Sequence, residues 1–139
     1  MTRFTSILAI ALLLSLHGGQ APAQETPEPV DYAIFMQVKT TPAWLALTPE
    51  ERFAFLGAVI EPVVGGAGDV TFRFFDSEFF SAQVTDVILW ETDDLSAYRM
   101  IIEKLRETPF WDTYFEVVQI IPSVENAYAD AYNQKPVGE

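Results

Sequence analysis

Arg73 and Asp86 form the pair of residues best suited to chemistry, and they lie on two neighbouring predicted strands. A hairpin that is symmetric about its tip places them directly opposite each other on one sheet face. A guanidinium and a carboxylate fixed beside Phe75 and Trp90 could orient a carboxylate, phenol or carbonyl group of a ligand. The alternative is a cross-strand or interface ion pair, which would stabilise the protein by about 0.2–1 kcal/mol if exposed.

Two glutamines are weaker candidates on the same predicted face. Gln37 and Gln119 lie on adjacent strands, and a glutamine on a buried face usually satisfies its amide across an interface. Trp90 could stack on a planar ligand, although aromatic residues at strand spacing more often belong to a core. The predicted ligand-binding residues are Gln37, Arg73, Phe75, Asp86, Trp90 and Gln119.

Two acidic segments, 76–78 and 91–94, have the oxygen ligands that hard cations accept. The predicted hairpin places them at opposite ends of one strand, and neither matches a calcium loop with its central glycine. Asp93 and Asp94 are better explained as the start of a helix, where they cap it and interact with its dipole. We therefore predict no metal site.

The composition excludes several function classes. The 139 residues include no cysteine, one histidine, twenty acidic and eight basic side chains, for a formal charge of −12. No disulfide, thiolate metal site or cysteine nucleophile is possible, and the acidic balance argues against nucleic acid as a partner. The sequence predicts no cofactor, since the glycines at 65–68 lack the lysine of a phosphate-binding loop. A chain of this length predicts one domain with its own core.

Residues 1–23 predict a secretory signal peptide. Arg3 precedes a short apolar run at 7–16 (ILAIALLLSL), and residues 21–23 give an A-x-A cleavage site. Cleavage after Ala23 removes Arg3 and His17, which leaves a chain of charge −13 without histidine and excludes histidine-based catalysis and metal binding. We expect a secreted or periplasmic protein with a flexible lead at 24–29, a single domain at 30–139 and no membrane span; the alternative is an uncleaved N-terminal anchor.

The remaining pattern predicts alternating strands and helices. Strands are expected at 31–40, 70–75, 84–91 and 115–121 from their period of two. One helix begins at the capping box of Thr48 and Glu51 and ends at Gly65–Gly66. A second follows the cap at 92–94, a single helical turn is expected at 109–114, and Ser123 could cap a tail helix.

This order predicts a ferredoxin-like βαββαβ sandwich with both helices on one face. The apolar set predicted beneath the helices is Ile34, Met36, Val38, Phe72, Phe74, Val87, Leu89, Val118 and Ile120. The set predicted on the open face is Ala33, Phe35, Gln37, Lys39, Thr71, Arg73, Phe75, Asp86, Ile88, Trp90, Phe115, Val117, Gln119 and Ile121. Such an apolar open face predicts a homodimer of the dimeric α+β barrel type.

Several blocks of the sequence resemble the darcynin family. They are 39–47 (KTTPAWLAL), 72–76 (FRFFD), 87–92 (VILWET), 108–112 (TPFWD) and 114–118 (YFEVV). The resemblance covers nearly all of residues 32–132. It implies a family of small bacterial proteins of unknown function, so it supports the fold and supplies no catalytic residues.

Three functions are compatible with these observations. The first is an exported binder of a small apolar or aromatic ligand over the open sheet face. The second, by analogy of fold, is a cofactor-independent oxygenase or isomerase in which Asp86 acts as acid or base and Arg73 as the oxyanion partner. The third is a structural or protein-interaction dimer without a ligand. A cavity within the dimer would favour the first two over the third.

Overall fold

A computed structural model describes residues 30–66 and 68–138. Its sheet has four strands, β1 (Tyr32–Thr40), β2 (Thr71–Asp76), β3 (Asp86–Thr92) and β4 (Phe115–Val124), in the order β2-β3-β1-β4. All neighbouring strands are antiparallel. The predicted ferredoxin-like βαββαβ architecture, with β1 and β3 inside and β2 and β4 at the edges, is confirmed. The predicted signal peptide and flexible lead lie outside the described residues.

The crossover between β1 and β2 begins with the short helix α1 (Pro42–Leu45) and a turn at 46–48. It continues as one helical rod, which consists of α2 (Pro49–Phe55), the π-helical turn η1 (Leu56–Ile60) and α3 (Glu61–Gly65). The predicted capping box is present, because the Thr48 hydroxyl accepts from the Glu51 N–H and the Glu51 carboxylate accepts from the Thr48 N–H. The π turn directly precedes Pro62, which has no N–H to give to the helix.

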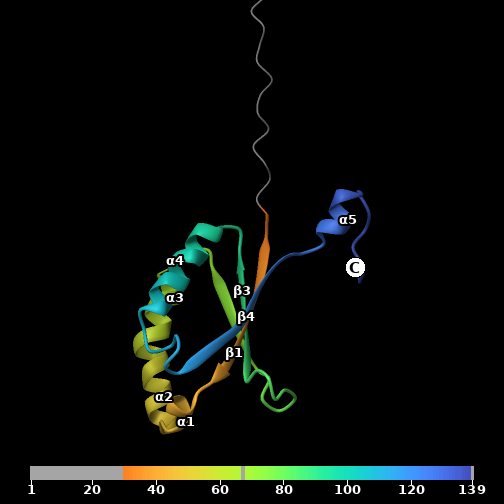
Figure 1. Ribbon diagram of the computed structural model, residues 1–139. Coiled ribbons are helices and arrows are strands. Elements are labelled where there is room, and N and C mark those ends of the chain that lie inside the picture. Colours follow the sequence, from red (N-terminus) through yellow and green to blue (C-terminus); the bar gives the residue numbers. More distant parts are fainter. Residues whose placement is uncertain (1–29, 67, 139) are drawn as a thin grey trace, which may run out of the picture.

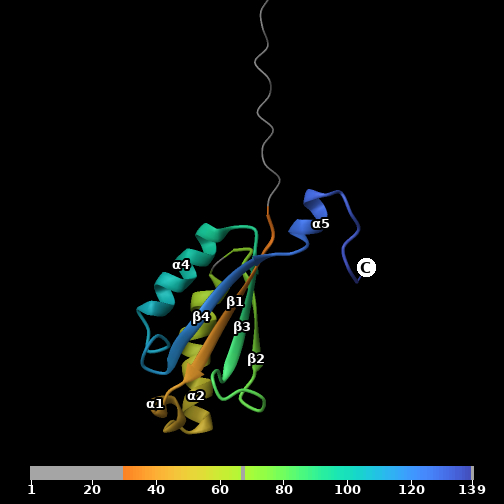
Figure 2. The ribbon, with the colours of Figure 1, turned by 45° about the vertical axis from the view of Figure 1, so that its right-hand side comes forward.

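The second crossover is α4 (Leu95–Arg106), and the Asp94 carboxylate caps it by accepting from the Ser96 and Ala97 N–H groups. The four helices α1 to α4 lie on one side of the sheet (Figure 1; Figure 2). The helical turn predicted at 109–114 was wrong, since these residues form turns in which Asp112 is left-handed. The cap predicted at Ser123 was also wrong, because Ser123 pairs within β4.

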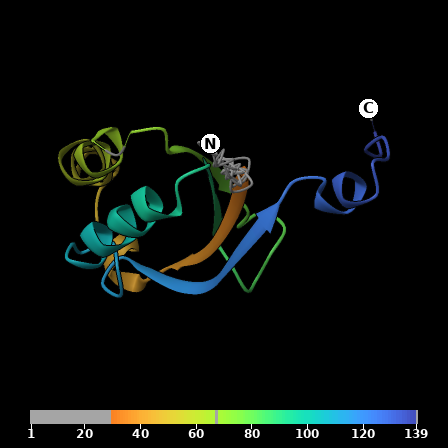
Figure 3. The same ribbon diagram turned by 90° about the horizontal axis from the view of Figure 1, so that it is seen from above.

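A short helix, α5 (Ala127–Ala131), follows β4 after the left-handed residue Asn126. It stands away from the sheet and the other helices, as the view from above shows (Figure 3). The rings of Tyr128 and Tyr132 pack on each other with centroids 4.9 Å apart, yet both side chains are largely exposed. The C-terminal arm, residues 125–138, therefore buries little of its aromatic surface within its own chain.

The register corrects the predicted faces of β3. Ile34 lies opposite Trp90, Met36 opposite Ile88 and Val38 opposite Asp86, and directly opposed side chains share a face. Asp86, Ile88 and Trp90 therefore lie on the helix-covered face, while Val87 and Leu89 lie on the open face. The run 87–90 is apolar at every position, so the sequence shows no alternation there from which the inner face could be predicted.

The first half of β4 is also reversed from the prediction. A register shift opposite Gln37 and Val38 skips Val118, so that Val117 pairs with Val38 and Phe115 with Thr40. A β-bulge of this kind exchanges the two faces of a strand over its remaining length. Phe115 consequently enters the core, and Val118 is exposed rather than covered by the helices.

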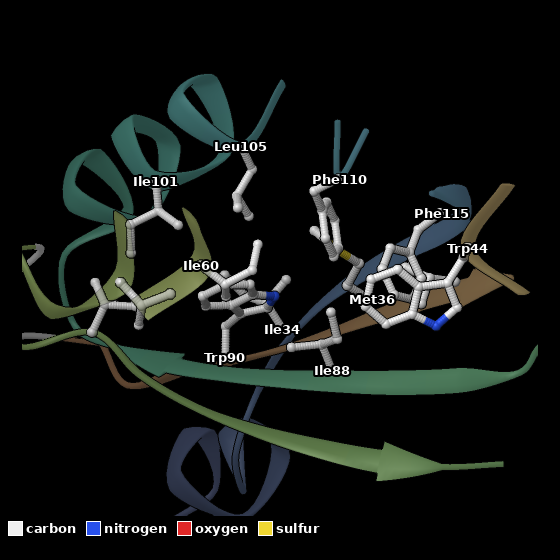
Figure 4. Packing of buried hydrophobic residues seen from close by; sticks show 13 residues of the cluster. Ile34, Met36, Trp44, Ile60, Ile88, Trp90, Ile101, Leu105, Phe110 and Phe115 are labelled. Carbon is white, nitrogen blue, oxygen red and sulfur yellow. The ribbon is translucent and has the colours of Figure 1, made fainter. Parts of the chain in front are cut away.

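The core lies between the sheet and the helices. Phe115 stacks on Phe110 at 4.8 Å between ring centroids and packs against Trp44 at 4.9 Å. Figure 4 shows this packing, with Leu105 of α4 and Ile60 of η1 above the sheet residues. The largest fully buried side chains are Trp90, Phe115, Ile34, Met36, Ile101, Leu105 and Val38. Over the described residues, no helix is long and apolar enough to cross a membrane.

Candidate functional site

A cleft of about 560 Å³ opens between the first helical rod and the outer half of the sheet. Phe72 and Phe74 of β2 form one wall, and Leu56 and Ile60 of η1 contribute to the opposite one. Trp90 and Ile88 of β3 line its base. Its volume is that of a typical small-molecule site, and its lining is mostly apolar with a few polar groups.

The aromatic wall formed by Phe72 and Phe74 is more exposed to solvent than is usual for a sheet face that helices cover. Phe72 and Phe74 are 37% and 44% exposed, although the helices cover this side of the sheet. Phe53 of α2, which also lines the cleft, is 74% exposed. Three phenyl rings are thus held at the mouth without being buried against one another, which is the arrangement of a groove open to a ligand.

Trp90 forms part of the base of the cleft. The side chain is 1% exposed, and its Nε1–H has no hydrogen-bond partner among the described residues. The indole lies beneath Ile60 in Figure 4, with its nitrogen at the end of the ring that faces Phe110. The nitrogen itself is buried from solvent, so the indole offers the cleft apolar ring surface and its N–H does not open into the cleft.

Asp86 places a carboxyl group at another point of the cleft. It is 5% exposed, and the Thr85 hydroxyl donates to its Oδ2 at 2.6 Å. Thr85 Oγ1 also accepts from the Thr40 N–H at 2.8 Å, which fixes the position of the hydroxyl. Burial raises the pKa of Asp86, as do the negative charges of Asp76 and Glu78, and the Thr85 hydrogen bond opposes the increase.

The charged residues around the cleft are mostly acidic. Glu61, Asp76 and Glu78 join Asp86 in its lining, and Arg52 is the only cationic residue among the lining residues. Arg52 donates from Nε to the Trp44 carbonyl at 3.2 Å and from Nη2 to the Leu45 carbonyl at 3.0 Å. Its guanidinium therefore ties α2 to the end of α1 and is not paired with the carboxylates within 4 Å.

The opposition predicted between Arg73 and Asp86 was wrong. Arg73 lies opposite Leu89, and Asp86 lies opposite Asp76, so the two residues are on different faces of the sheet. Arg73 instead forms an ion pair with Glu91, with Nη2 and Oε1 3.3 Å apart, and both side chains are about half exposed. Asp86 and Arg73 therefore cannot act together as an acid and its oxyanion partner, because they lie on opposite faces of the sheet.

The six residues predicted as ligand contacts fall into two groups. Asp86 and Trp90 lie in the cleft, whereas Gln37, Arg73, Phe75 and Gln119 lie on the open face. Gln37 and Gln119 are directly opposite each other there, as their placement on adjacent strands implies. Phe53, Phe72 and Phe74 were not among the residues predicted to contact a ligand. A phenylalanine at every second position of an edge strand was the available signal.

A second hollow of about 420 Å³ lies at the opposite end of β1 and β3. Its lining includes the acidic residues Asp31, Asp69, Glu91, Asp93 and Glu125. Within residues 30–66 and 68–138, no group of three or more histidine, aspartate or glutamate side chains could hold a metal ion. This hollow is therefore a concentration of negative charge on the surface.

Comparison with known proteins decides the family. A model of the darcynin family, described as a domain of unknown function, matches residues 21–139. The chain belongs to the darcynin family. A darcynin homolog from Streptomyces avermitilis is 51% identical over 117 residues, which cover 84% of this chain and 95% of that protein. A homolog from Granulibacter bethesdensis is 48% identical over 105 residues, or 75% of this chain and 85% of the homolog.

Solved structures support the fold of this darcynin. The chlorite dismutase of Candidatus Nitrospira defluvii in complex with imidazole matches with a TM-score of 0.59 and 19% sequence identity, over 72% of this chain and 42% of the other. A structure provisionally assigned as a chlorite dismutase gives a TM-score of 0.61 at 20% identity, over 76% and 48%. The darcynin spans less than half of each of these chains. At such identities the likeness shows the shared fold alone.

Proposed function

We propose that this darcynin binds a small, largely apolar or aromatic molecule in the cleft between the first helical rod and strands β2 and β3. The observation that carries the proposal is the aromatic wall of the 560 Å³ cleft, since Phe72 and Phe74 remain 37% and 44% exposed on the helix-covered side of the sheet. Apolar surface held open in this way is typical of a ligand groove. This site replaces the open sheet face as the expected location.

The shape of the cleft supports a ligand of modest size. Apolar side chains supply most of its walls, and the polar groups are few and separated, which suits an oriented aromatic body. Phe72 lies 5.5 Å from Trp90 between ring centroids at an interplanar angle of 31°, so the two rings form a tilted aromatic pair. A planar ligand packs on the exposed ring of Phe72 and displaces water from apolar surface.

Titration with the neutral dye Nile red tests the proposal through its fluorescence. The wild type is expected to bind the dye with saturable enhancement, and Leu56→Trp, which fills the cleft, is expected to weaken binding by about tenfold or more, or about 1.4 kcal/mol. Leu95→Trp makes the same change outside the cleft lining and serves as the control. Equal binding by all three proteins would contradict the cleft as the site.

We further propose that the protein associates with a second copy through its open sheet face. Phe35, Phe75 and Ile121 on that face are exposed, and the aromatic C-terminal arm buries little surface within its own chain. Apolar surface of this kind commonly becomes an interface. Sedimentation equilibrium should give a dimer mass, and Phe35→Glu should shift it to the monomer; a monomeric wild type at high concentration would overturn this proposal.

We propose that the protein is exported after cleavage near Ala23, with the mature chain secreted or periplasmic. Support comes from the apolar run and the A-x-A sequence at the N-terminus. Intact mass spectrometry of the protein from its native host should identify Gln24 as the first residue. An intact Met1 would contradict export.

A further inference from the structure

The end of the cleft near Asp86 holds like charges, and no described cation lies within 4 Å of them. Asp86 and Asp76 are directly opposite each other on neighbouring strands, and Glu78 follows on the next loop. Within the described residues, the ion pair closer than 4 Å is that of Arg73 and Glu91, on the other face of the sheet. Like charges directly opposite across a strand pair destabilise the sheet. A cation bound at this end would remove the repulsion.

We propose that the ligand of the cleft is an arylalkylamine whose ammonium group is bound by Asp86 and whose aromatic ring lies in the apolar part of the cleft. This inference rests on the proposed function, because it names the chemical class that the same cleft takes. The ammonium group lies between the carboxylates of Asp86 and Asp76. The aromatic body lies along Phe72 and Phe74.

The polarity of the cleft changes along β3 in a way that fits such a ligand. Asp86, Ile88 and Trp90 share one face of the strand, and about 13 Å separate the Cα atoms of Asp86 and Trp90. Ile88 is apolar, and Phe72 and Phe74 lie opposite Trp90 and Ile88 on β2. The cleft thus presents a hydrogen-bond acceptor at one end and an apolar, aromatic surface beside it.

The walls favour a cation over a neutral or anionic group. Phenyl rings attract an ammonium group through their faces, and Phe72 and Phe74 stand on the strand that also carries Asp76. The four carboxyl groups of the lining outnumber the single guanidinium of Arg52, which is engaged with two backbone carbonyls. An anionic ligand would meet repulsion from this field, and a cationic ligand would be attracted.

Binding of an ammonium group requires the Asp86 carboxyl group to be ionised, so proton binding at Asp86 competes with the ligand. The groups that face it are Asp76 from β2, Glu78 from the following loop, Thr85 and, across the cleft, Arg52. Lys39 follows Val38 on β1 and so lies on the opposite face of the sheet, where its ammonium donates to the Ala82 carbonyl at 3.2 Å. Because burial and the two acidic neighbours raise the pKa of Asp86, amine binding should weaken as the pH falls, beginning at a higher pH than for an ordinary aspartate.

Calorimetric titration with four matched probes tests the inference. Tyramine carries an ammonium group and a phenol oxygen, tyrosol replaces the ammonium with a hydroxyl, para-hydroxyphenylacetate replaces it with a carboxylate, and phenethylamine lacks the phenol oxygen. We expect tyramine to bind about tenfold tighter than tyrosol and the carboxylate to bind weakest. Phenethylamine should bind about as tightly as tyramine, because Asp86 recognises the ammonium group that both amines carry. Leu56→Trp should weaken all of them.

Asp86→Asn isolates the charge. Its amide oxygen can still accept from Thr85, so the variant should fold, and thermal unfolding verifies this. We expect it to lose about tenfold in tyramine affinity and to bind tyrosol unchanged. Glu103→Gln, which removes an exposed acidic group from α4, is the control and should bind both probes like the wild type.

The outcomes separate this inference from the proposed function. Equal affinity for tyramine and tyrosol, or equal tyramine affinity in wild type and Asp86→Asn, would overturn the amine while the cleft remains a binding site. Binding of Nile red without binding of any of the four probes would also overturn it. Failure of Leu56→Trp to weaken Nile red would overturn the proposed function itself.

Discussion

Two halves of the same sheet face differ in how completely the helices cover them. Over β1, Ile34 and Met36 are 0% exposed beneath a layer that includes Leu105 of α4. Over β2, Phe72 and Phe74 remain more than a third exposed. Both halves are apolar, so hydrophobicity does not explain the difference in exposure. The difference follows from how closely the helices above each half approach the sheet.

The first helical rod covers β2 only in part. Ile60 of η1 and Val64 of α3 are buried in the core, whereas α2 contains no buried residue. The rod is therefore buried more deeply along η1 and α3 than along α2, where Phe55 packs against Trp44 and Tyr114 and Phe53 remains exposed. The cleft arises where the first crossover leaves part of edge strand β2 uncovered.

The largest expected difference between the halves is in the cost of truncation. Leu105→Ala removes a fully buried side chain from the filled half and should lower the free energy of unfolding by about 2–5 kcal/mol. Phe74→Ala in the open half should cost less than half as much, because its ring is already partly solvated. Urea unfolding measures both. Equal losses would show that the two halves are packed alike.

The caps of α4 and α2 should differ in their effects, because one supports global stability and the other mainly prevents local opening of its own helix. Asp94→Ala removes the cap of α4, which packs on the filled half, and should lower global stability by about 1 kcal/mol. Thr48→Ala removes the cap of the less anchored α2 and should chiefly speed amide exchange within residues 49–55. Hydrogen exchange followed by mass spectrometry separates local from global opening. Unchanged exchange in α2 would contradict the contrast.

Asp86 should give the cleft a pH dependence. Its folded pKa is raised above the usual value of 3.8, so the folded state binds the proton more tightly than the unfolded state. The stability associated with this proton is fully present below pH 3.8 and is lost as the pH rises through the folded pKa. Asp86→Asn lacks this loss, so its stability relative to the wild type should increase with pH. A stability difference between the two proteins that does not change with pH would contradict a raised pKa of Asp86.

The smallest effect is expected on the open face. Arg73 and Glu91 are about half exposed, so Arg73→Ala should change stability by about 0–1 kcal/mol and less at high salt. It should leave Nile red binding unchanged, since Arg73 does not line the cleft. Loss of dye binding in this variant would indicate that the ligand binds on the open face and not in the cleft.

Local sequence signals predicted the elements and the topology. The capping box at Thr48, the cap at Asp94 and the period of two in β1 are short-range features, and each one is present in the structure. The strand order followed from these elements and from the handedness of crossovers. The family and fold were therefore accessible from residues alone.

The faces of β3 and the location of the cleft were not accessible in the same way. The segment 87–90 is apolar throughout, and a one-residue change of parity moves Asp86 from one side of the sheet to the other. The bulge that turns Phe115 inward depends on pairing between β1 and β4, which is a tertiary property. The gap above β2 depends on where the helical rod is anchored.

Methyl NMR during a titration with tyrosol tests most directly whether the ligand lies in the cleft or on the open face. Ile60 and Ile88 report on the cleft, and Leu89 and Ile121 report on the opposite face. The proposed site predicts saturable shifts of the Ile60 and Ile88 methyl groups while those of Leu89 and Ile121 stay in place. Shifts of Leu89 and Ile121 with the cleft methyl groups unchanged would contradict it.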